Sequence, residues 1–293
     1  MNRSEMTRRV FARTVASAVV ASMAGRTAFA EAGLAADSLR RDAPATSPMR
    51  PLRVGMLLFP ELTAIDLVGP QTVLSTHADI HLIWKTKDLI HSDRGMGMKP
   101  DTTLEECPRD LDVLFVPGGR GMLAVMRDRE LLDFLADRGG RARYVTSVCT
   151  GALVLGAAGL LKGYKATTHW AARDVLRVFG AEPAPGRVVV DRNRVTGGGV
   201  TAGLDFGFVL LAALRGERAA RVTQLAMEYD PQPPFDAGSP GAAGPEITRL
   251  AQESLADLQR ETRATIAEIM AARNRSSGSV DSSRSPGTRM GGR

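Results

Sequence analysis

Short apolar runs alternate with segments of helical periodicity along most of the chain. The run at residues 53–60 is apolar almost throughout and is closed by Pro60, which is typical of a strand buried on both faces of a parallel sheet. Residues 62–76 follow with apolar side chains at the spacing of a helix. The same patterns predict strands at 80–84, 112–119 and 143–148, and helices at 131–138 and 150–161.

The second half of the chain continues this alternation. At 188–197 two short β-rich runs flank a polar turn at 191–193 and end in a run of glycines, and a helix is predicted from about 202 to 214. This order indicates an α/β fold with an open, mostly parallel sheet and helices on both faces, in one domain over residues 51–240. Because the strand ends share one edge of such a sheet, we expect a site in a crevice there.

The N-terminal residues, 1–30, have the features of an export signal. An arginine pair at 8–9 precedes an apolar run at 15–24 and the small-x-small sequence Ala-Phe-Ala at 28–30. This pattern resembles a twin-arginine signal peptide, which predicts a periplasmic or secreted protein. The alternatives are a basic N-terminal arm or an uncleaved anchor helix. The apolar run is too short to span a bilayer comfortably, so we expect no stable membrane anchor after cleavage.

Three further segments lie outside the predicted domain. Residues 31–50 have no periodicity and predict a flexible linker. Residues 241–272 have apolar positions at helical spacing, which predicts an amphipathic helix that docks on the body or on a partner subunit. Ser, Gly and Arg dominate from residue 273, so a disordered basic tail is expected over 273–293.

The positive charge of the chain is concentrated at its two ends. The formal net charge is +6, but residues 1–30 and 273–293 each contain five arginines against a single acidic residue. The segment between them is therefore slightly acidic. Such a body lacks the electrostatic footprint of a nucleic-acid-binding protein, so no nucleic-acid partner is expected.

The chain has two cysteines, so no disulfide framework holds the fold together. Cys107 precedes a proline and is predicted to fill a small apolar space between a loop and a strand. Cys149 follows a predicted strand and precedes a predicted helix. A bridge between the two is not expected, because a cysteine in such a turn points into a pocket.

Cys149 occupies the position of the nucleophile in a strand-turn-helix elbow. The positive end of the following helix should favour its thiolate form. Gly118 and Gly119, at a neighbouring strand end, are candidates for oxyanion and substrate binding, because their backbone can approach closely. The alternative is a buried core cysteine without chemistry.

Asp66 is the candidate acid/base group, because it lies among apolar residues just after the first strand and burial would raise its pKa. Its alternative is a solvated capping residue. Thr150, not histidine, follows Cys149, so no local Cys-His pair exists. His169 is a candidate for lining the crevice, although a lone histidine is more often structural.

Two other features of the sequence do not indicate a catalytic or cofactor site. The remaining histidines show no metal-ligand spacing, so no metal site is expected. The glycine-rich loop at 197–203 lacks the lysine of a phosphate loop, and we expect it to be a tight turn that shapes the crevice.

Several separated motifs over residues 52–240 together resemble the ThiJ/PfpI superfamily, and within it the isonitrile hydratase branch. The motifs are Phe59-Pro60, Asp66-Leu-Val-Gly-Pro70, Ser92-Asp-Arg-Gly95, Phe115-Val-Pro-Gly-Gly119, Ser147-Val-Cys-Thr-Gly-Ala152, Ala166-Thr-Thr-His-Trp170 and Glu228-Tyr-Asp-Pro-Gln-Pro-Pro-Phe-Asp-Ala-Gly-Ser-Pro240.

This resemblance implies a flavodoxin-like three-layer α/β sandwich, similar to class I glutamine amidotransferases, that forms a homodimer. It implies Cys149, Asp66 and Thr150 as catalytic residues that hydrate a small-molecule isonitrile to an N-substituted formamide through a thioimidate. No metal or organic cofactor is expected, since a thiolate adds to the isonitrile carbon directly.

Two other classes of function stay open. One is a non-catalytic ligand-binding or sensor protein, because the cysteine-threonine pattern also occurs in the sensor half of AraC-type regulators. The other is a different cysteine hydrolase of amidase type. Peptidase-like members of the superfamily carry histidine directly after the cysteine, so Thr150 argues against protease activity.

Overall fold

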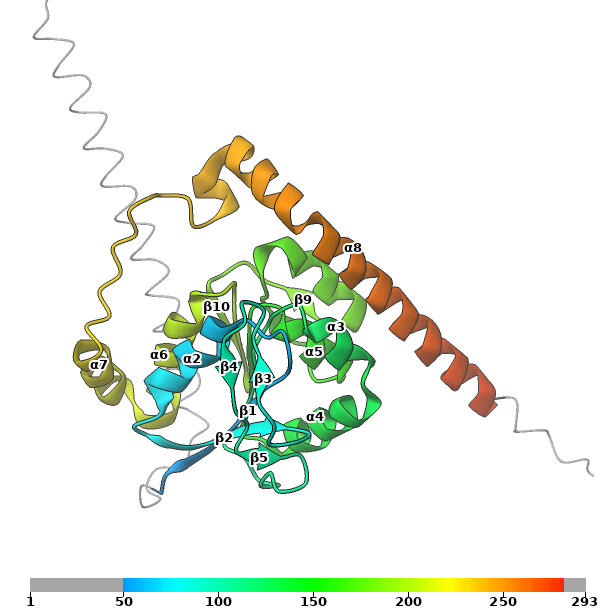
Figure 1. Ribbon diagram of the computed structural model, residues 1–293, viewed down its shortest axis with the longest axis horizontal. Coiled ribbons are helices and arrows are strands. Elements are labelled where there is room, and N and C mark those ends of the chain that lie inside the picture. Colours follow the sequence, from blue (N-terminus) through cyan, green and yellow to red (C-terminus); the bar gives the residue numbers. More distant parts are fainter. Residues whose placement is uncertain (1–49, 282–293) are drawn as a thin grey trace, which may run out of the picture.

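The fold is built on a seven-stranded sheet, which a computed structural model places at the centre of the chain (Figure 1). The structure describes residues 50–281. The elements are, in chain order, β1 Leu52–Leu57, α2 Ala64–Leu74, β2 Ala78–Trp84, β3 Ile90–His91, β4 Gly97–Met98, β5 Thr102–Thr103, β6 Val113–Val116, α3 Met122–Arg127, α4 Arg129–Arg141, β7 Tyr144–Val148, α5 Gly151–Ala157, β8 Lys165–Ala166, the 3₁₀ helix η1 Trp170–Phe179, β9 Glu182–Pro183, β10 Val188–Asp191, β11 Arg194–Gly197, α6 Ala202–Arg215, α7 Glu217–Ala226 and α8 Pro240–Asp281.

The strand order is β10-β11-β7-β6-β1-β2-β5, and within this sheet of the described residues only the β10–β11 pair is antiparallel. From β1 the chain first adds β2 on one side, and β6, β7 and β11 then add on the other. The strand order therefore reverses between β1 and β6, which is where ligands bind in open α/β sheets. The predicted mostly parallel α/β sheet is confirmed.

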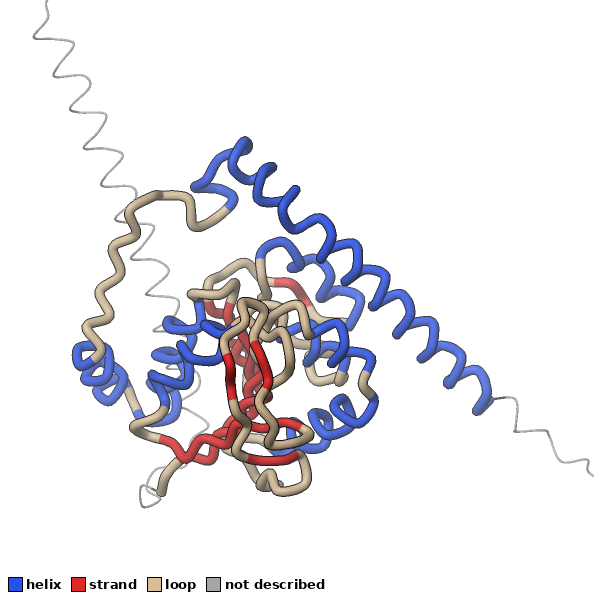
Figure 2. Tube along the Cα trace, in the orientation of Figure 1, coloured by secondary structure: helices blue, strands red, loops and turns tan. Residues whose placement is uncertain are grey.

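Helices cover both faces of the sheet in two groups (Figure 2). Helices α2, α6 and α7 pack on one another on one face, while α3, α4, α5 and η1 form the group on the other. The strands β1, β6 and β7 between them are almost entirely buried. Burial on both faces explains why these strands are continuous apolar runs rather than alternating ones.

Helix α8 lies across the outside of the second group, against α3 and η1 (Figure 1). Its regular part starts after Gly244, whose φ of 76° breaks the helix just before Pro245. The helix continues to Asp281, past the predicted end at residue 272. It docks within the subunit, which is one of the two arrangements that the sequence allows.

The predicted elements and the structure agree in type and differ at their ends. The helix expected over 150–161 ends at Ala157, because Gly159 has a φ of 79° and turns the chain. Helices α3 and α7 and the 3₁₀ helix η1 are not among the predicted elements. The predicted signal at 1–30, the linker up to residue 49 and the tail from residue 282 lie outside the described residues. The first part of the predicted disordered tail, 273–281, is helical instead, because α8 continues through it. Between residues 50 and 281 no helix combines the length and apolarity that crossing a bilayer requires.

Candidate active site

Cys149 stands at the turn between β7 and α5 in a left-handed backbone conformation, with a φ of 55°. Its N–H donates to the carbonyls of Gly198 at 2.7 Å and Gly197 at 3.2 Å. Its own carbonyl accepts from the Thr168 hydroxyl at 2.6 Å. Positive φ in a residue other than glycine costs about 1–3 kcal/mol and persists only where the surroundings hold it. The predicted elbow is confirmed, and these three bonds hold its strained backbone.

Asp66 lies in the first turn of α2 and is completely buried. Its Oδ2 accepts the Gly118 N–H at 2.9 Å, and its Oδ1 has no hydrogen-bond partner. Burial raises the pKa of Asp66 to about 7, although hydrogen bonds from Gly118 and the Cys149 side chain act in the opposite direction. The solvated capping alternative is therefore wrong, and the carboxyl titrates in the range useful for acid/base chemistry.

Cys149 is only 5% exposed, and its thiol faces Asp66. Burial, followed by the negative charge of Asp66, raises the pKa of the Cys149 thiol above its ordinary value. The backbone N–H groups of Val200 and Thr150 partly offset this rise. The expectation of a lowered thiol pKa is thus wrong, because burial, and after it the charge of Asp66, disfavour the thiolate more strongly than the helix end favours it. The thiol and the carboxylate form one coupled pair.

The neighbouring glycines are required by close packing. A Cβ on Gly118 would lie 2.7 Å from both Asp66 Oδ2 and Cys149 Cβ. Gly119 has a φ of 128°, and a Cβ there would lie 2.5 Å from Glu61 O. A side chain at either position would therefore push into the site or into the loop after β1.

The amides of these two glycines are already engaged. Gly118 N–H donates to Asp66, and Gly119 N–H donates to the Thr150 hydroxyl at 3.1 Å. Their expected role as oxyanion donors is not supported. The amides that face the sulfur belong to Thr150 and Val200. Sequence reasoning missed Val200, although the glycines at 197–199 pointed to the turn that positions it.

His169 lies beside the site with a structural role as well. Its Nδ1 accepts the Ala171 N–H at 3.3 Å and caps η1, and its ring packs against Gly199. Burial and then Arg173 lower the pKa of His169, so the ring is neutral at physiological pH. His169 therefore lines the cavity, as expected, with an uncharged ring.

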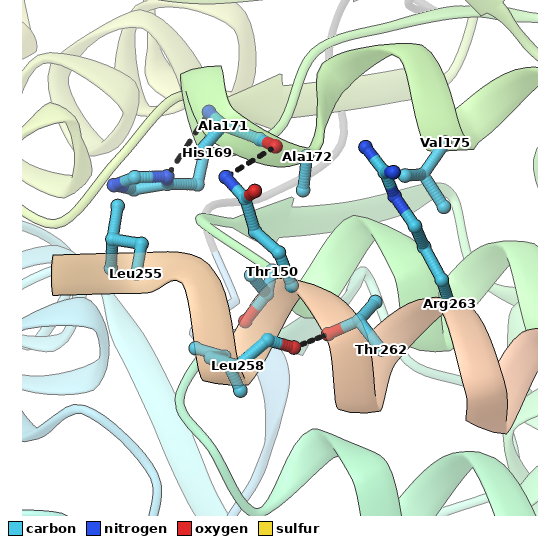
Figure 3. A pocket seen from close by; sticks show the side chains of 10 residues that line it. Thr150, His169, Ala171, Ala172, Val175, Leu255, Leu258, Thr262 and Arg263 are labelled. Carbon is cyan, nitrogen blue, oxygen red and sulfur yellow. Dashed lines mark hydrogen bonds between the residues drawn. The ribbon is translucent and has the colours of Figure 1, made fainter. Parts of the chain in front are cut away.

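A cavity of about 30 Å³ adjoins Thr150 and His169 (Figure 3). Its lining comes from three places: the catalytic turn, η1 and α8. The lining residues are Thr150, His169, Ala171, Ala172, Val175, Leu255, Leu258, Gln259, Thr262 and Arg263. The contribution of α8 was not foreseen, because this helix is about a hundred residues away from Cys149 in the sequence.

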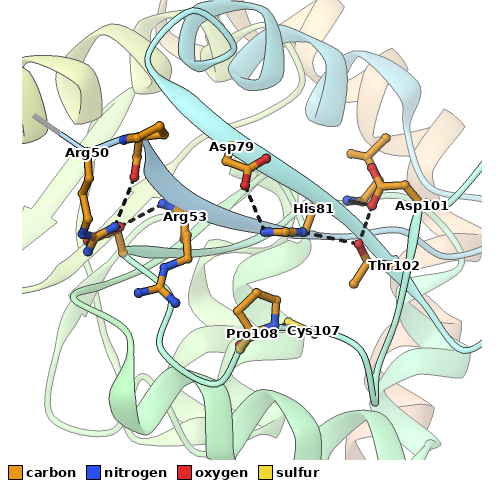
Figure 4. A network of polar contacts seen from close by, with 11 residues as sticks. Arg50, Arg53, Asp79, His81, Asp101, Thr102, Cys107 and Pro108 are labelled. Carbon is orange, nitrogen blue, oxygen red and sulfur yellow. Dashed lines mark hydrogen bonds and ion pairs between the residues drawn. The ribbon is translucent and has the colours of Figure 1, made fainter.

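The other cysteine lies away from this cavity, among polar contacts near the amino ends of β1 and β6 (Figure 4). Asp112 there accepts from the Arg50 guanidinium and the Arg53 N–H at 2.8 Å. Cys107 is buried, and burial raises the pKa of its thiol. Both cysteines are free thiols, and Cys107 belongs to the buried core, as predicted for a small filler. Within residues 50–281 no group of three or more potential metal ligands comes together.

Fold and site define an α/β protein with a buried cysteine at a strand-to-helix elbow, paired with a buried carboxyl. The sequence pattern of the DJ-1/PfpI family matches residues 52–213, and the chain belongs to this family.

Three relatives sharpen this assignment. The chain is 48% identical over 224 residues to an isonitrile hydratase of Pseudomonas putida, which covers 76% of this chain and 97% of that protein. A crystal structure of a ThiJ/PfpI family protein from Pseudomonas syringae superposes with a TM-score of 0.73 at 48% identity, covering 76% of this chain and 97% of that one. The transcriptional regulator GbdR of Pseudomonas aeruginosa is 30% identical, but the chain spans only 53% of its length.

Proposed function

We propose that this protein is an isonitrile hydratase-like enzyme that adds water to a small isonitrile and releases an N-substituted formamide. The observation that carries the proposal is the buried Cys149–Asp66 pair at the carboxyl ends of the parallel strands, with Thr150 directly after the cysteine. The near-complete coverage of an isonitrile hydratase at 48% identity supports the same reaction.

One proton shared by the pair explains how a buried thiol with a raised pKa reacts. Above about pH 7 the site holds a thiol and a carboxylate, and the thiol donates its hydrogen bond to Asp66. Transfer of that proton gives a thiolate and a carboxylic acid without any change in net charge. The buried site does not have to hold two negative charges, so the nucleophile and the acid are produced together.

The first chemical step forms the covalent intermediate. The Cys149 thiolate adds to the terminal carbon of the isonitrile, forming a carbon–sulfur bond. The same carbon takes the proton of the Asp66 carboxylic acid. The product is a thioimidate, and Asp66 returns to its carboxylate form. The N–H groups of Thr150 and Val200 face the sulfur and stabilise the thiolate that attacks.

The second step consumes water. The oxygen of a water molecule attacks the thioimidate carbon while Asp66 takes one proton from that water. Asp66 then passes the proton to the substrate nitrogen. Collapse of the tetrahedral adduct breaks the carbon–sulfur bond and forms the formamide carbonyl. The remaining hydroxyl proton returns through Asp66 to the sulfur, which restores the starting thiol. The Thr150 hydroxyl, held by Gly119 N–H, lies where it can orient this water.

The test of the proposed function is product formation by purified protein from a panel of substrates. Methyl and cyclohexyl isonitrile are incubated beside simple amides, and products are quantified by nuclear magnetic resonance. We expect the matching N-substituted formamides and no amide hydrolysis. Amide hydrolysis without formamide would assign an amidase-type hydrolase, and binding of isonitriles without turnover would assign a sensor.

We also propose that the mature chain is exported and acts as a homodimer. The arginine pair and the Ala-Phe-Ala sequence at 28–30 support export by the twin-arginine route. Cell fractionation of the producing bacterium, with the arginine pair replaced by lysines as a control, tests the first part. Sedimentation of the purified mature chain tests the second.

A further inference from the structure

Helix α8 forms one wall of the cavity beside the catalytic turn. Leu255 and Leu258 of α8 lie opposite Thr150 and His169 (Figure 3), and Gln259 of the same helix also lines the cavity. We propose that Leu255 and Leu258 set the largest N-substituent that the enzyme accepts. This inference rests on the proposed isonitrile hydration, since it names the part of that substrate which meets the helix.

The chemistry of the wall fits an uncharged hydrocarbon substituent. From η1 the cavity receives Ala171, Ala172 and Val175, and from α8 it receives the two leucines. One donor of the Gln259 amide is engaged, because its Nε2 donates to the Ala171 carbonyl at 3.3 Å. An alkyl or aryl group loses little on entering such surroundings, whereas a cationic group would lose its hydration and meet the guanidinium of Arg263.

The part of α8 after the two leucines, residues 261–268, holds this wall in place. Thr265 and Ile266 are buried against the body, and Glu261 pairs with Arg120 at 2.6 Å. Farther along, Glu268 pairs with Arg127 at 2.7 Å. Arg120 directly follows Gly118 and Gly119, so this ion pair ties the helix to the loop after β6, which we call the catalytic loop.

The size of the cavity makes the two leucines limiting. A volume of about 30 Å³ holds about two water molecules. A methyl group fits such a space with little adjustment, whereas a cyclohexyl ring fits only when the wall moves, so the larger isonitrile should react more slowly. Replacing either leucine by alanine removes three carbon atoms from the wall and leaves room for a larger group.

Steady-state kinetics with small and large isonitriles test this directly. The quantity is the ratio of kcat/KM for cyclohexyl isonitrile to that for methyl isonitrile. We expect it to rise about tenfold or more in Leu255→Ala or Leu258→Ala, the scale by which a few methylenes change selection in apolar pockets. Leu250→Ala is the matched control, because Leu250 lies on the same helix but is 47% exposed.

A second measurement reads the same wall without turnover. Alkylation of Cys149 by N-methylmaleimide and N-cyclohexylmaleimide is followed by mass spectrometry of its peptide, with thermal melting to show that each variant is folded. We expect the rate ratio of large to small reagent to rise in the two cavity variants and to stay unchanged in Leu250→Ala.

The outcomes separate the inference from the proposed function. Formamide production with equal selectivity in all variants, together with equal alkylation ratios, would overturn the role of α8 and leave the hydratase standing. No formamide from any variant, with alkylation ratios that still change, would overturn hydration while the wall is confirmed.

Discussion

The catalytic turn and the α8 wall of the cavity next to it are built in different ways. On the body side, which the cavity meets at Thr150, Cys149 and Asp66 are buried and fixed by backbone hydrogen bonds, glycines and a strained turn. On the α8 side, Leu255 and Leu258 are only partly buried. The helix that carries them is held by ion pairs that are about half exposed.

This difference separates chemistry from selectivity. Backbone geometry leaves little freedom on the body side, so a change there should affect every substrate alike. Side chains of a distant helix form the other wall, where a change alters shape without moving the reacting groups. The catalytic side is therefore expected to tolerate little substitution, and the α8 side to tune substrate size.

Apart from removal of the Cys149 thiol itself, the largest effect is expected for Asp66→Asn, which removes the proton carrier but keeps an oxygen to accept the Gly118 N–H. We predict a loss in kcat/KM of about 10²–10⁴-fold, the usual contribution of a positioned acid/base group. In the wild-type protein kcat/KM should rise with pH through about 7, as Asp66 becomes a carboxylate. Residual activity of Asp66→Asn should lack this rise. An unchanged profile in the variant would assign the titration to another group.

The same substitution should stabilise the fold at alkaline pH. Because the folded-state pKa of Asp66 is raised from 3.8 to about 7, the folded state favours the protonated carboxyl. The contribution of this carboxyl to the free energy of unfolding is therefore greatest below about pH 4, and it is lost as the pH rises to about 7. Asparagine is neutral throughout, so urea unfolding at pH 8 should show a gain of about 2–4 kcal/mol, with no gain near pH 4. A loss of stability in Asp66→Asn at pH 8 would mean that the surroundings of Asp66 stabilise its charged carboxylate.

A smaller but still large effect is expected for Gly118→Ala. The added methyl group would lie 2.6 Å from Thr150 N and 2.7 Å from Asp66 Oδ2, so the pair must move apart. We predict a loss in kcat/KM of about 100-fold, equal for methyl and cyclohexyl isonitrile, as expected for a displacement near 1 Å. Gly140→Ala is the control, because nothing lies within 4 Å of its added carbon. A shift in substrate preference in Gly118→Ala would contradict the claim that changes on the body side affect every substrate alike.

The smallest effect is expected for Glu261→Gln on the α8 side. The Arg120–Glu261 pair is about half exposed, so its loss should change the free energy of unfolding by less than about 1 kcal/mol. Activity toward methyl isonitrile should stay within about twofold of wild type. Glu253→Gln, which removes an i,i+4 pair within the helix, is the comparison. A large loss of activity in Glu261→Gln alone would show that the helix also positions the catalytic loop.

The sequence predicted the catalytic turn well because its signals are local. An apolar strand, Cys149 and a following helix are consecutive, and glycines mark the close approaches around them. It predicted the direction of the thiol pKa shift wrongly, because the shift depends on how deeply the fold buries the thiol and on the charge of Asp66, which lies on α2, 83 positions earlier in the chain. The cavity wall on α8 could not be found from periodicity, since an amphipathic pattern shows that a helix docks but not where.

The central claim is that Cys149 carries the reaction, and the rate of formamide formation in matched cysteine variants tests it most directly. Cys107 is also a buried free thiol but lies away from the cavity, so Cys107→Ala controls for the loss of a cysteine. With methyl isonitrile, we predict no detectable formamide from folded Cys149→Ala and nearly wild-type rates from Cys107→Ala. Formamide formation at the wild-type rate by Cys149→Ala would contradict the account.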